Sequence, residues 1–128
     1  MILKRISLNL RIFSHCLEIL YFYRFKEFNE CIKIIQLKRK KYFSNLSPHY
    51  LLKKINLFSS LLMHNNCFYK SMCLFTLLNN CEKVELIIGI KKSKEDKVLS
   101  HSWIEYKGHP LEEEKLINEF QPLLKMKK

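Results

Sequence analysis

Several features that would assign this chain of 128 residues to a common class are missing from it. No two of its five cysteines stand at the CxxC spacing typical of zinc sites, so the sequence predicts neither a metal nor a cofactor. No run approaches the ~18 apolar residues that a membrane-spanning helix needs. The N-terminal segment has no uninterrupted hydrophobic region and no small-residue cleavage site, so a secretory signal is not predicted. Without internal repeats or linkers, residues 1–128 are expected to form one domain.

Acidic residues are also scarce, at 12 against 23 lysines and arginines, which gives a net charge of +11. Such a chain should attract an acidic partner: nucleic acid, an anionic membrane surface or an acidic peptide. The lysines fall in short runs and form no basic stripe interleaved with aromatic residues, and no nucleic-acid-binding motif is present. Nucleic acid is therefore not the expected partner. Hydrophobic residues make up 48% of the chain, too many for a disordered protein.

The cysteines are odd in number and show no pairing pattern. They stand at positions 16, 31, 67, 73 and 81. This usage is typical of free thiols in a reducing compartment, so we expect a cytoplasmic protein.

Residues 1–63 are expected to be helical. Apolar residues recur at helical spacing in two stripes before the basic run at residues 38–41, and the first stripe also leaves a membrane-surface helix as an alternative. A third helix is predicted from Ser47 as N-cap and Pro48 at the first helical position, running to about Met63. The segment contains no convincing strand, so we interpret it as a scaffold.

The second half of the chain mixes both kinds of element. The spacing predicts a helix over residues 67–78, a buried β-branched strand over 84–90, an alternating strand over 100–106, and a return strand over 109–113. A closing helix is predicted from the apolar residues between 116 and 124, shortened or bent by Pro122. The fold class is therefore expected to be α+β.

Cys67 has the sequence context of a nucleophile. Asn66 is a favourable N-cap, so the thiol should stand at the first helical position. There the positive end of the helix dipole favours a thiolate, and free backbone N–H groups could hold an oxyanion. The alternative is a cysteine that merely packs at a helix start. Cys73 and Cys81 are less suited, because one is rotated away on the helix and the other follows it.

His101 is the candidate base, because it is the one histidine inside a clear strand, on the face that it shares with Trp103. A three-residue turn ending at Gly108 would pair His101 with Glu113, and directly opposed side chains point to the same face. A two-residue turn would pair it with Glu114 instead. We choose Glu113 as the acid that orients the imidazole. The alternative is that residues 112–114 cap the closing helix.

These residues also carry a family resemblance. Cys67, Ser71, the Leu77-Leu78 pair, the strand ELIIGI and the hairpin HSWIEYKGHPL are similar to those of the lasso-peptide leader peptidases. That family belongs to the transglutaminase-like, papain-type superfamily, and its acid twelve residues after the histidine falls on Glu113. The sequence departs from the family pattern in having glutamate where aspartate is usual. It also has LLNNCEK where arginines and a glycine are usual.

The resemblance implies a fold and an activity. Residues 1–63 would be a helical scaffold, and residues 64–128 would form a papain/transglutaminase-like core in which the cysteine-bearing helix packs on a small antiparallel sheet. The activity would be hydrolysis of one peptide bond, removing the leader from a ribosomally synthesised precursor peptide. Cys67 would be the nucleophile, His101 the base and Glu113 the orienting acid. The implied partners are a separate winged-helix protein that binds the leader and an ATP-dependent macrolactam-forming cyclase.

Two other functions remain open at this stage. The same three residues would serve transglutaminase-like acyl transfer to an amine. A basic binding protein without catalysis, for nucleic acid or a membrane surface, is the alternative from another class.

Overall fold

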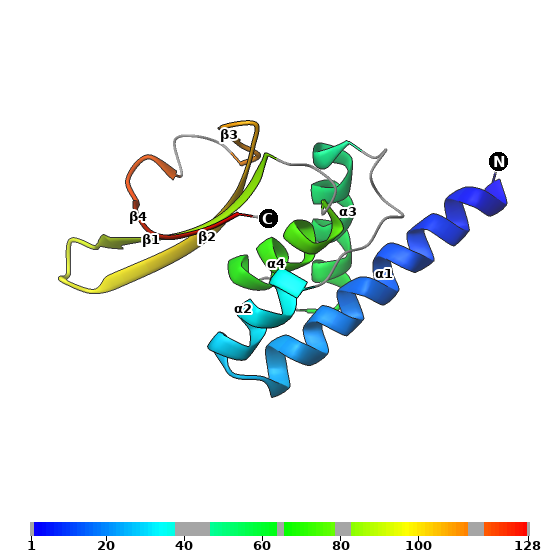
Figure 1. The fold of residues 1–128 in the computed structure, drawn as a ribbon, viewed down its shortest axis with the longest axis horizontal. Coiled ribbons are helices and arrows are strands. Elements are labelled where there is room, and N and C mark those ends of the chain that lie inside the picture. The colour runs from blue at the N-terminus through cyan, green and yellow to red at the C-terminus, as the bar shows by residue number, and fades with distance from the viewer. Residues whose placement is uncertain (1, 38–46, 64–65, 79–82, 113–116, 128) are drawn as a thin grey trace.

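The computed structural model describes residues 2–37, 47–63, 66–78, 83–112 and 117–127. Within these ranges the four helices come first and the four strands follow (Figure 1). The helices are α1 (Ile2–Phe25), α2 (Phe28–Leu37), α3 (Pro48–Leu61) and α4 (Cys67–Leu77). The strands are β1 (Val84–Lys92), β2 (Val98–Tyr106), β3 (His109–Pro110) and β4 (Gln121–Lys127). This arrangement confirms the predicted α+β class.

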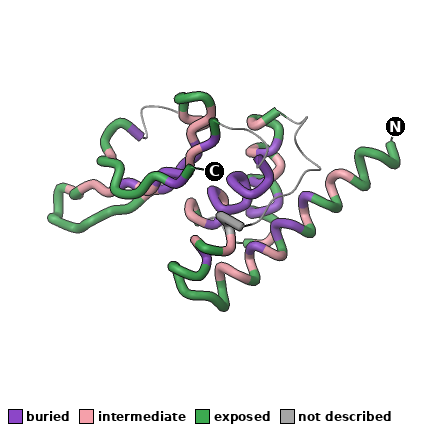
Figure 2. The backbone as a smooth tube through the Cα atoms, viewed as in Figure 1, coloured by how far each residue is buried: buried purple, intermediate pink, exposed green. Residues whose placement is uncertain are grey.

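The helix α4 is the centre of the molecule, and Figure 2 shows it buried along almost its whole length. From Tyr69 to Leu77 every residue is buried except Lys70, which is partly exposed. The helix contacts α1 and α3 on one side and β2 on the other. A buried hydrogen bond ties α4 to α1 inside this core: the Tyr69 hydroxyl donates to the Cys16 carbonyl oxygen at 2.7 Å. Cys67 therefore begins a helix that the core holds firmly.

The four strands form one antiparallel sheet in the order β3-β2-β1-β4. Its two faces are different. Leu86, Ile104 and Met126 join the core around α4. On the other face, Ile87, Trp103 and Ile117 form a smaller cluster with Phe120. Because side chains alternate along a strand, His101 shares the face of Trp103, whereas Ser102 turns toward α4.

The predicted closing helix is wrong. The C-terminal residues Gln121–Lys127 form β4, which pairs with β1 from Glu85 to Ile90. β2 pairs with only one edge of the buried strand β1, and the N–H and C=O groups on the other edge also need partners. β4 supplies those partners. Pro122 is compatible with this strand because β4 lies at the edge of the sheet, at a bulge opposite Gly89.

The predicted three-residue turn is wrong as well. Tyr106 pairs directly with His109, so the loop consists of Lys107 and Gly108, with φ angles of 52° and 79°. Such two-residue turns match the right-handed twist of the strands, which outweighs the poor preference of lysine for positive φ. The Lys107 N–H also donates to the Lys83 carbonyl oxygen at 2.9 Å, tying the turn to the start of β1. The register that was used to select Glu113 is therefore not the observed one.

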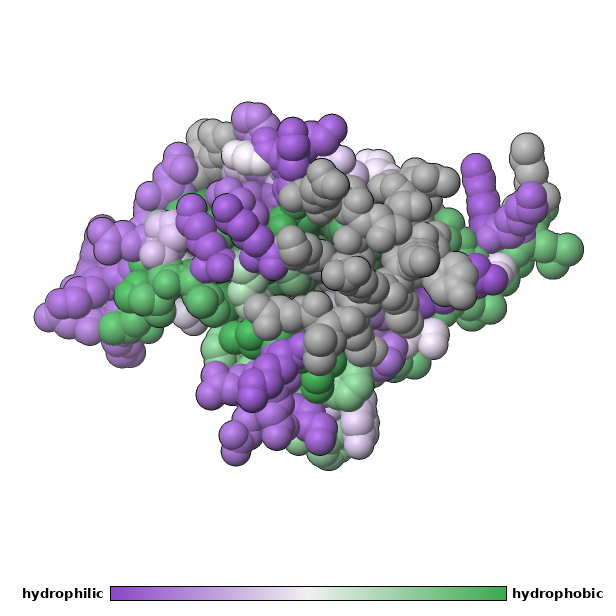
Figure 3. All heavy atoms as spheres, in the orientation of Figure 1, coloured by the Kyte–Doolittle hydropathy of each residue, from purple (hydrophilic) through white to green (hydrophobic). Residues whose placement is uncertain are grey.

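The first helix extends beyond the rest of the molecule at its N-terminal end (Figure 1). Its buried residues lie on one face, at Ile12, His15, Cys16 and Ile19. Leu3, Ile6 and Leu10 are exposed, and Figure 3 shows hydrophobic atoms on this projecting end. None of the described helices has the length and apolar character that crossing a membrane requires.

Candidate active site

Cys67 stands at the first position of α4, as the sequence predicted. The Asn66 side chain caps the helix by accepting hydrogen bonds from the N–H groups of Phe68 at 2.9 Å and Tyr69 at 3.2 Å. Two of the free N–H groups at this helix start are thus satisfied by the cap. The Cys67 N–H is not among them, so it is a candidate donor to an oxyanion.

His101 is positioned by the sheet and by two aromatic rings. It pairs with Gly89 on β1, and its ring stacks on Trp103 with centroids 6.0 Å apart at an angle of 19°. Phe120 covers it from another side, at 5.5 Å. Gly89 makes this packing possible, because a Cβ there would lie 2.9 Å from the Trp103 ring. The imidazole is therefore held by rigid neighbours.

The Cys67 thiol and the His101 imidazole are close enough to shift each other's pKa. Hydrogen bonding to His101 is the main reason that the pKa of the Cys67 thiol falls from 9.0 to about 7. Hydrogen bonding to Cys67, followed by that to Glu112, raises the pKa of His101 from 6.5 to about 9. Since the thiol now loses its proton before the imidazolium does, a thiolate–imidazolium pair is the main form between these two values.

The carboxylate at His101 belongs to Glu112. Its Oε2 lies 2.9 Å from Nε2 of His101, and the two side chains are 31% and 22% exposed. Since Nε2 faces Glu112, Nδ1 is the ring nitrogen left for the thiol. The predicted acid, Glu113, lies outside the described residues. The sequence argument considered Glu112 only as a helix cap, because it extended the return strand to residue 113 and chose the acid by cross-strand pairing. In the structure β3 ends at Pro110, so strand pairing does not decide which carboxylate reaches His101.

Ser102 is a second residue that the sequence argument missed. Its backbone and its hydroxyl both help to lower the pKa of the Cys67 thiol, after the larger effect of His101. The hydroxyl also donates to the Ser71 Oγ at 3.2 Å, which joins β2 to α4 beside the thiol. Strand alternation would not have found it, because a base expected to face Cys67 would place the next residue on the opposite face of the strand.

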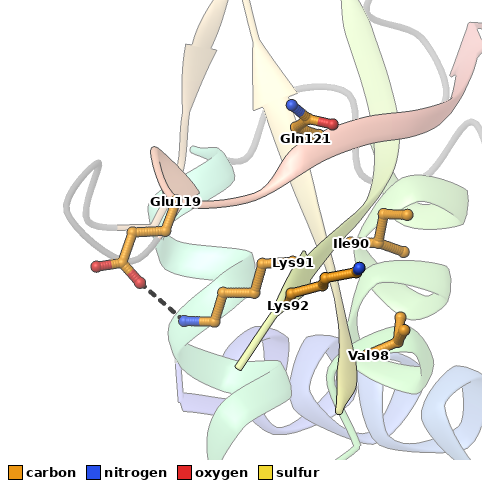
Figure 4. Close-up of a pocket in the computed structure, with 6 residues that line it drawn as sticks. All are labelled: Ile90, Lys91, Lys92, Val98, Glu119 and Gln121. Carbon is orange, nitrogen blue, oxygen red and sulfur yellow. Dashed lines mark hydrogen bonds and ion pairs between the residues drawn. The ribbon is translucent and has the colours of Figure 1, made fainter. Parts of the chain in front are cut away.

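A cavity of about 220 Å³ opens at the thiol. Its lining comes from five elements or their caps: Tyr23, Phe28, Asn66, Cys67, Phe68, Ile88, Ser100, His101 and Ser102. A larger hollow of about 670 Å³ lies near the turn end of the β1–β2 hairpin, but it includes neither Cys67 nor His101 (Figure 4). There Lys91 is paired with Glu119 at 2.8 Å. The small cavity is the one in which a reacting group can meet the thiolate.

The other described cysteines are structural. Cys16, Cys31 and Cys73 are free and buried. Burial raises the pKa of the Cys31 and Cys73 thiols, so they remain protonated and unreactive at neutral pH. Cys81 lies outside the described residues. Among the described thiols, the geometry singles out Cys67.

A thiol at a helix start, an imidazole on an antiparallel sheet and a carboxylate beside that imidazole form the kind of arrangement in which a cysteine can be activated as a nucleophile. The comparison with protein families agrees: the model of the transglutaminase-like superfamily matches residues 52–125, and the chain belongs to that superfamily. Its members are typically cysteine peptidases or acyltransferases. No curated protein and no solved structure matches the chain significantly.

Proposed function

We propose that the protein is a cysteine peptidase that removes the leader from a ribosomally synthesised precursor peptide, with Cys67 as nucleophile and His101 as general base and acid. The single observation that carries the peptidase part is the mutual pKa shift of Cys67 and His101, which gives a thiolate near neutral pH. We assign the orienting role to Glu112, which hydrogen-bonds Nε2 of His101. Glu113, expected from the sequence, remains the alternative for this role.

The chemistry follows from these positions. The Cys67 thiolate attacks the carbonyl carbon of the scissile peptide bond, and the oxyanion that forms is within the reach of the helix start. The imidazolium of His101 gives its proton to the leaving amine, the C–N bond breaks, and an acyl-enzyme thioester remains. The imidazole then takes a proton from water, which attacks the thioester and releases the acid. Glu112 stabilises the imidazolium in both steps.

The choice of a leader peptide as the substrate rests on the resemblance to the lasso-peptide leader peptidases. In that setting the protein acts in the reducing cytoplasm, a separate winged-helix protein supplies leader recognition, and the released core peptide goes to a macrolactam-forming cyclase. The surplus of positive charge favours an acidic leader or partner, so high salt should weaken the association.

The test is to incubate the full chain with a precursor peptide and the winged-helix partner and to identify the products by mass spectrometry. We expect one peptide bond to be cut, and Cys67→Ala to lower the rate by about 10³-fold or more. Cys73→Ala is the matched control, because it removes a buried thiol from the same helix and should retain activity per folded molecule. A product cross-linked to an amine would favour acyl transfer instead. Full function in Cys67→Ala would favour a binding protein without catalysis.

A further inference from the structure

The cavity at Cys67 does not end at the catalytic residues. A second hollow of about 480 Å³ adjoins it and is lined by Tyr23, Arg24, Lys26, Phe28, Cys31 and Phe68. Tyr23, Phe28 and Phe68 line both hollows. Together the two form one groove that leads from the thiol to the corner between α1 and α2. We call it the corner groove.

Three aromatic rings form the part of the corner groove nearest to the thiol. The Phe28 and Phe68 rings have centroids 5.1 Å apart, and those of Tyr23 and Phe68 are 6.3 Å apart. Phe28 is 50% exposed, although large apolar side chains are usually covered. Phe68 is the residue that follows the nucleophile, so a ring placed on this cluster would lie beside the scissile bond. The cluster fits an aromatic or large aliphatic side chain.

The far part of the corner groove is basic. Arg24 and Lys26 line it, and both are exposed. In the described part of the chain, no ion pair involves either of them. Glu27 and Glu30 belong to the same corner, but neither lines the groove. The charged side chains that line the groove are therefore both positive, and they favour a carboxylate, although Glu30 is near enough to Cys31 to raise the pKa of that thiol.

We propose that the corner groove binds the substrate peptide on one side of the scissile bond, with an aromatic or large aliphatic residue on the ring cluster and an acidic residue at Arg24 and Lys26. This inference rests on the proposed peptidase function, because it needs a peptide at Cys67. It adds the substrate class: a segment in which an apolar residue near the cut is accompanied by acidic residues farther along. It also assigns the selectivity to the helical half of the chain.

Binding can be measured without cleavage in the Cys67→Ala background. The probe is a short fluorescein-labelled peptide in which a phenylalanine is flanked by glutamates, and its fluorescence anisotropy gives the Kd. A matched peptide with lysines in place of the glutamates should bind at least about tenfold more weakly, and one with alanine in place of phenylalanine should also lose affinity. Adding 0.5 M salt should reduce the difference between the two charged peptides, because screening weakens exposed ion pairs.

Two sets of variants locate the site. Arg24→Glu with Lys26→Glu should weaken the glutamate peptide about tenfold or more and improve the lysine peptide. Lys92→Glu with Lys94→Glu changes the net charge equally, but on the β1–β2 hairpin, which points away from the helices (Figure 1), and it should leave the preference unchanged. Phe28→Ala, an exposed ring in the groove, should weaken both peptides.

The outcomes separate this inference from the proposed function. Equal loss of affinity in the two charge-reversed pairs would mean that binding follows net charge alone, and the inference would be overturned. Equal affinity for glutamate and lysine peptides would overturn it as well. Groove-specific binding without any cleavage by the chain that retains Cys67 would instead overturn the peptidase function and leave a peptide-binding groove.

Discussion

Cys67 and Glu112 both converge on His101, but they reach it from regions that are built differently. Cys67 begins a helix whose body is buried between two other helices and the sheet, and Asn66 caps that helix. Glu112 follows β3, which pairs with β2 through only two residues. The Leu111 N–H adds one backbone bond, to the Ile104 carbonyl oxygen at 3.0 Å. The nucleophile is thus fixed by the core, whereas the acid is held by local contacts at the surface.

This difference indicates how each region can fail. A change at the nucleophile end affects the thiolate through the helix start, through His101 or, to a smaller extent, through Ser102. At the acid end, the Glu112 carboxylate is partly exposed, so water screens its attraction to the imidazolium. Water can also partly replace the carboxylate when it is lost.

His101→Ala should have the largest effect, because it removes the common partner of both regions. Without the imidazole, the pKa of the Cys67 thiol should rise from about 7 toward its usual 9.0, so the thiolate fraction at neutral pH falls. The loss of the proton donor adds to this, and peptide cleavage should fall by about 10³-fold or more. The pH dependence of Cys67 alkylation by iodoacetamide measures the thiol alone. A midpoint that stays near 7 in the variant would contradict the assigned pair.

Glu112→Gln should lower the rate of cleavage less, by about 10- to 100-fold, because the amide keeps the shape but cannot stabilise the imidazolium as the carboxylate does. The pKa of His101 should fall from about 9, since its hydrogen bond and attraction to Glu112 both help to raise it. The falling limb of the pH–rate profile should therefore move to lower pH.

Glu113→Gln is the matched control for this acid, because it makes the same chemical change one residue farther along. It should leave the rate and the profile close to those of the unchanged protein. If Glu113→Gln has the larger effect of the two, the acid is the one that the sequence predicted.

The contrast between the two regions also explains what the sequence could predict. The position of Cys67 depends on local signals, an Asn66 cap and a periodic apolar run, and both are readable from the chain. The assignment of His101 to a strand depends on an equally local signal, the alternation of residues 100–106. The choice of the acid depended on the turn between β2 and β3. There the twist of the strands and a hydrogen bond to Lys83 outweigh the poor preference of Lys107 for a positive φ angle. The strand conformation of Gln121–Lys127 depends on pairing with β1. This is a tertiary requirement, and the apolar pattern of these residues alone does not reveal it.

Gly89→Ala should disturb His101 through its packing. The new Cβ would lie 2.9 Å from the Trp103 ring, which is 2% exposed and has no room to retreat without moving the imidazole stacked on it. We expect a loss of stability of about 1–3 kcal/mol and a several-fold lower rate per folded molecule.

Gly108→Ala is the control for this change, because it strains the turn at φ 79° but meets no atom within 4 Å. It should lower the stability by about 1 kcal/mol and affect the rate much less. Thermal unfolding and the rate of cleavage, measured on the same samples, distinguish the two glycines. Equal effects on the rate would argue against a role of the Trp103 stack in holding His101.

Asn66→Asp should have the smallest effect, and it acts on the nucleophile end alone. Aspartate caps a helix about as well as asparagine, and its charge at the helix start adds about 0.3–1 kcal/mol, so the melting temperature should hold or rise. The same charge lies beside the thiolate and disfavours it, so the pKa of Cys67 should increase above about 7. Cleavage should then fall a few-fold near neutral pH and recover at higher pH. Asn66→Ala should instead cost about 1 kcal/mol of stability, without the added charge. If the thiol pKa fell whenever stability rose and rose whenever stability fell, the cap would act on Cys67 only by holding the helix. A raised thiol pKa with unchanged or higher stability in the aspartate variant would show that the charge at the helix start acts on the thiolate directly.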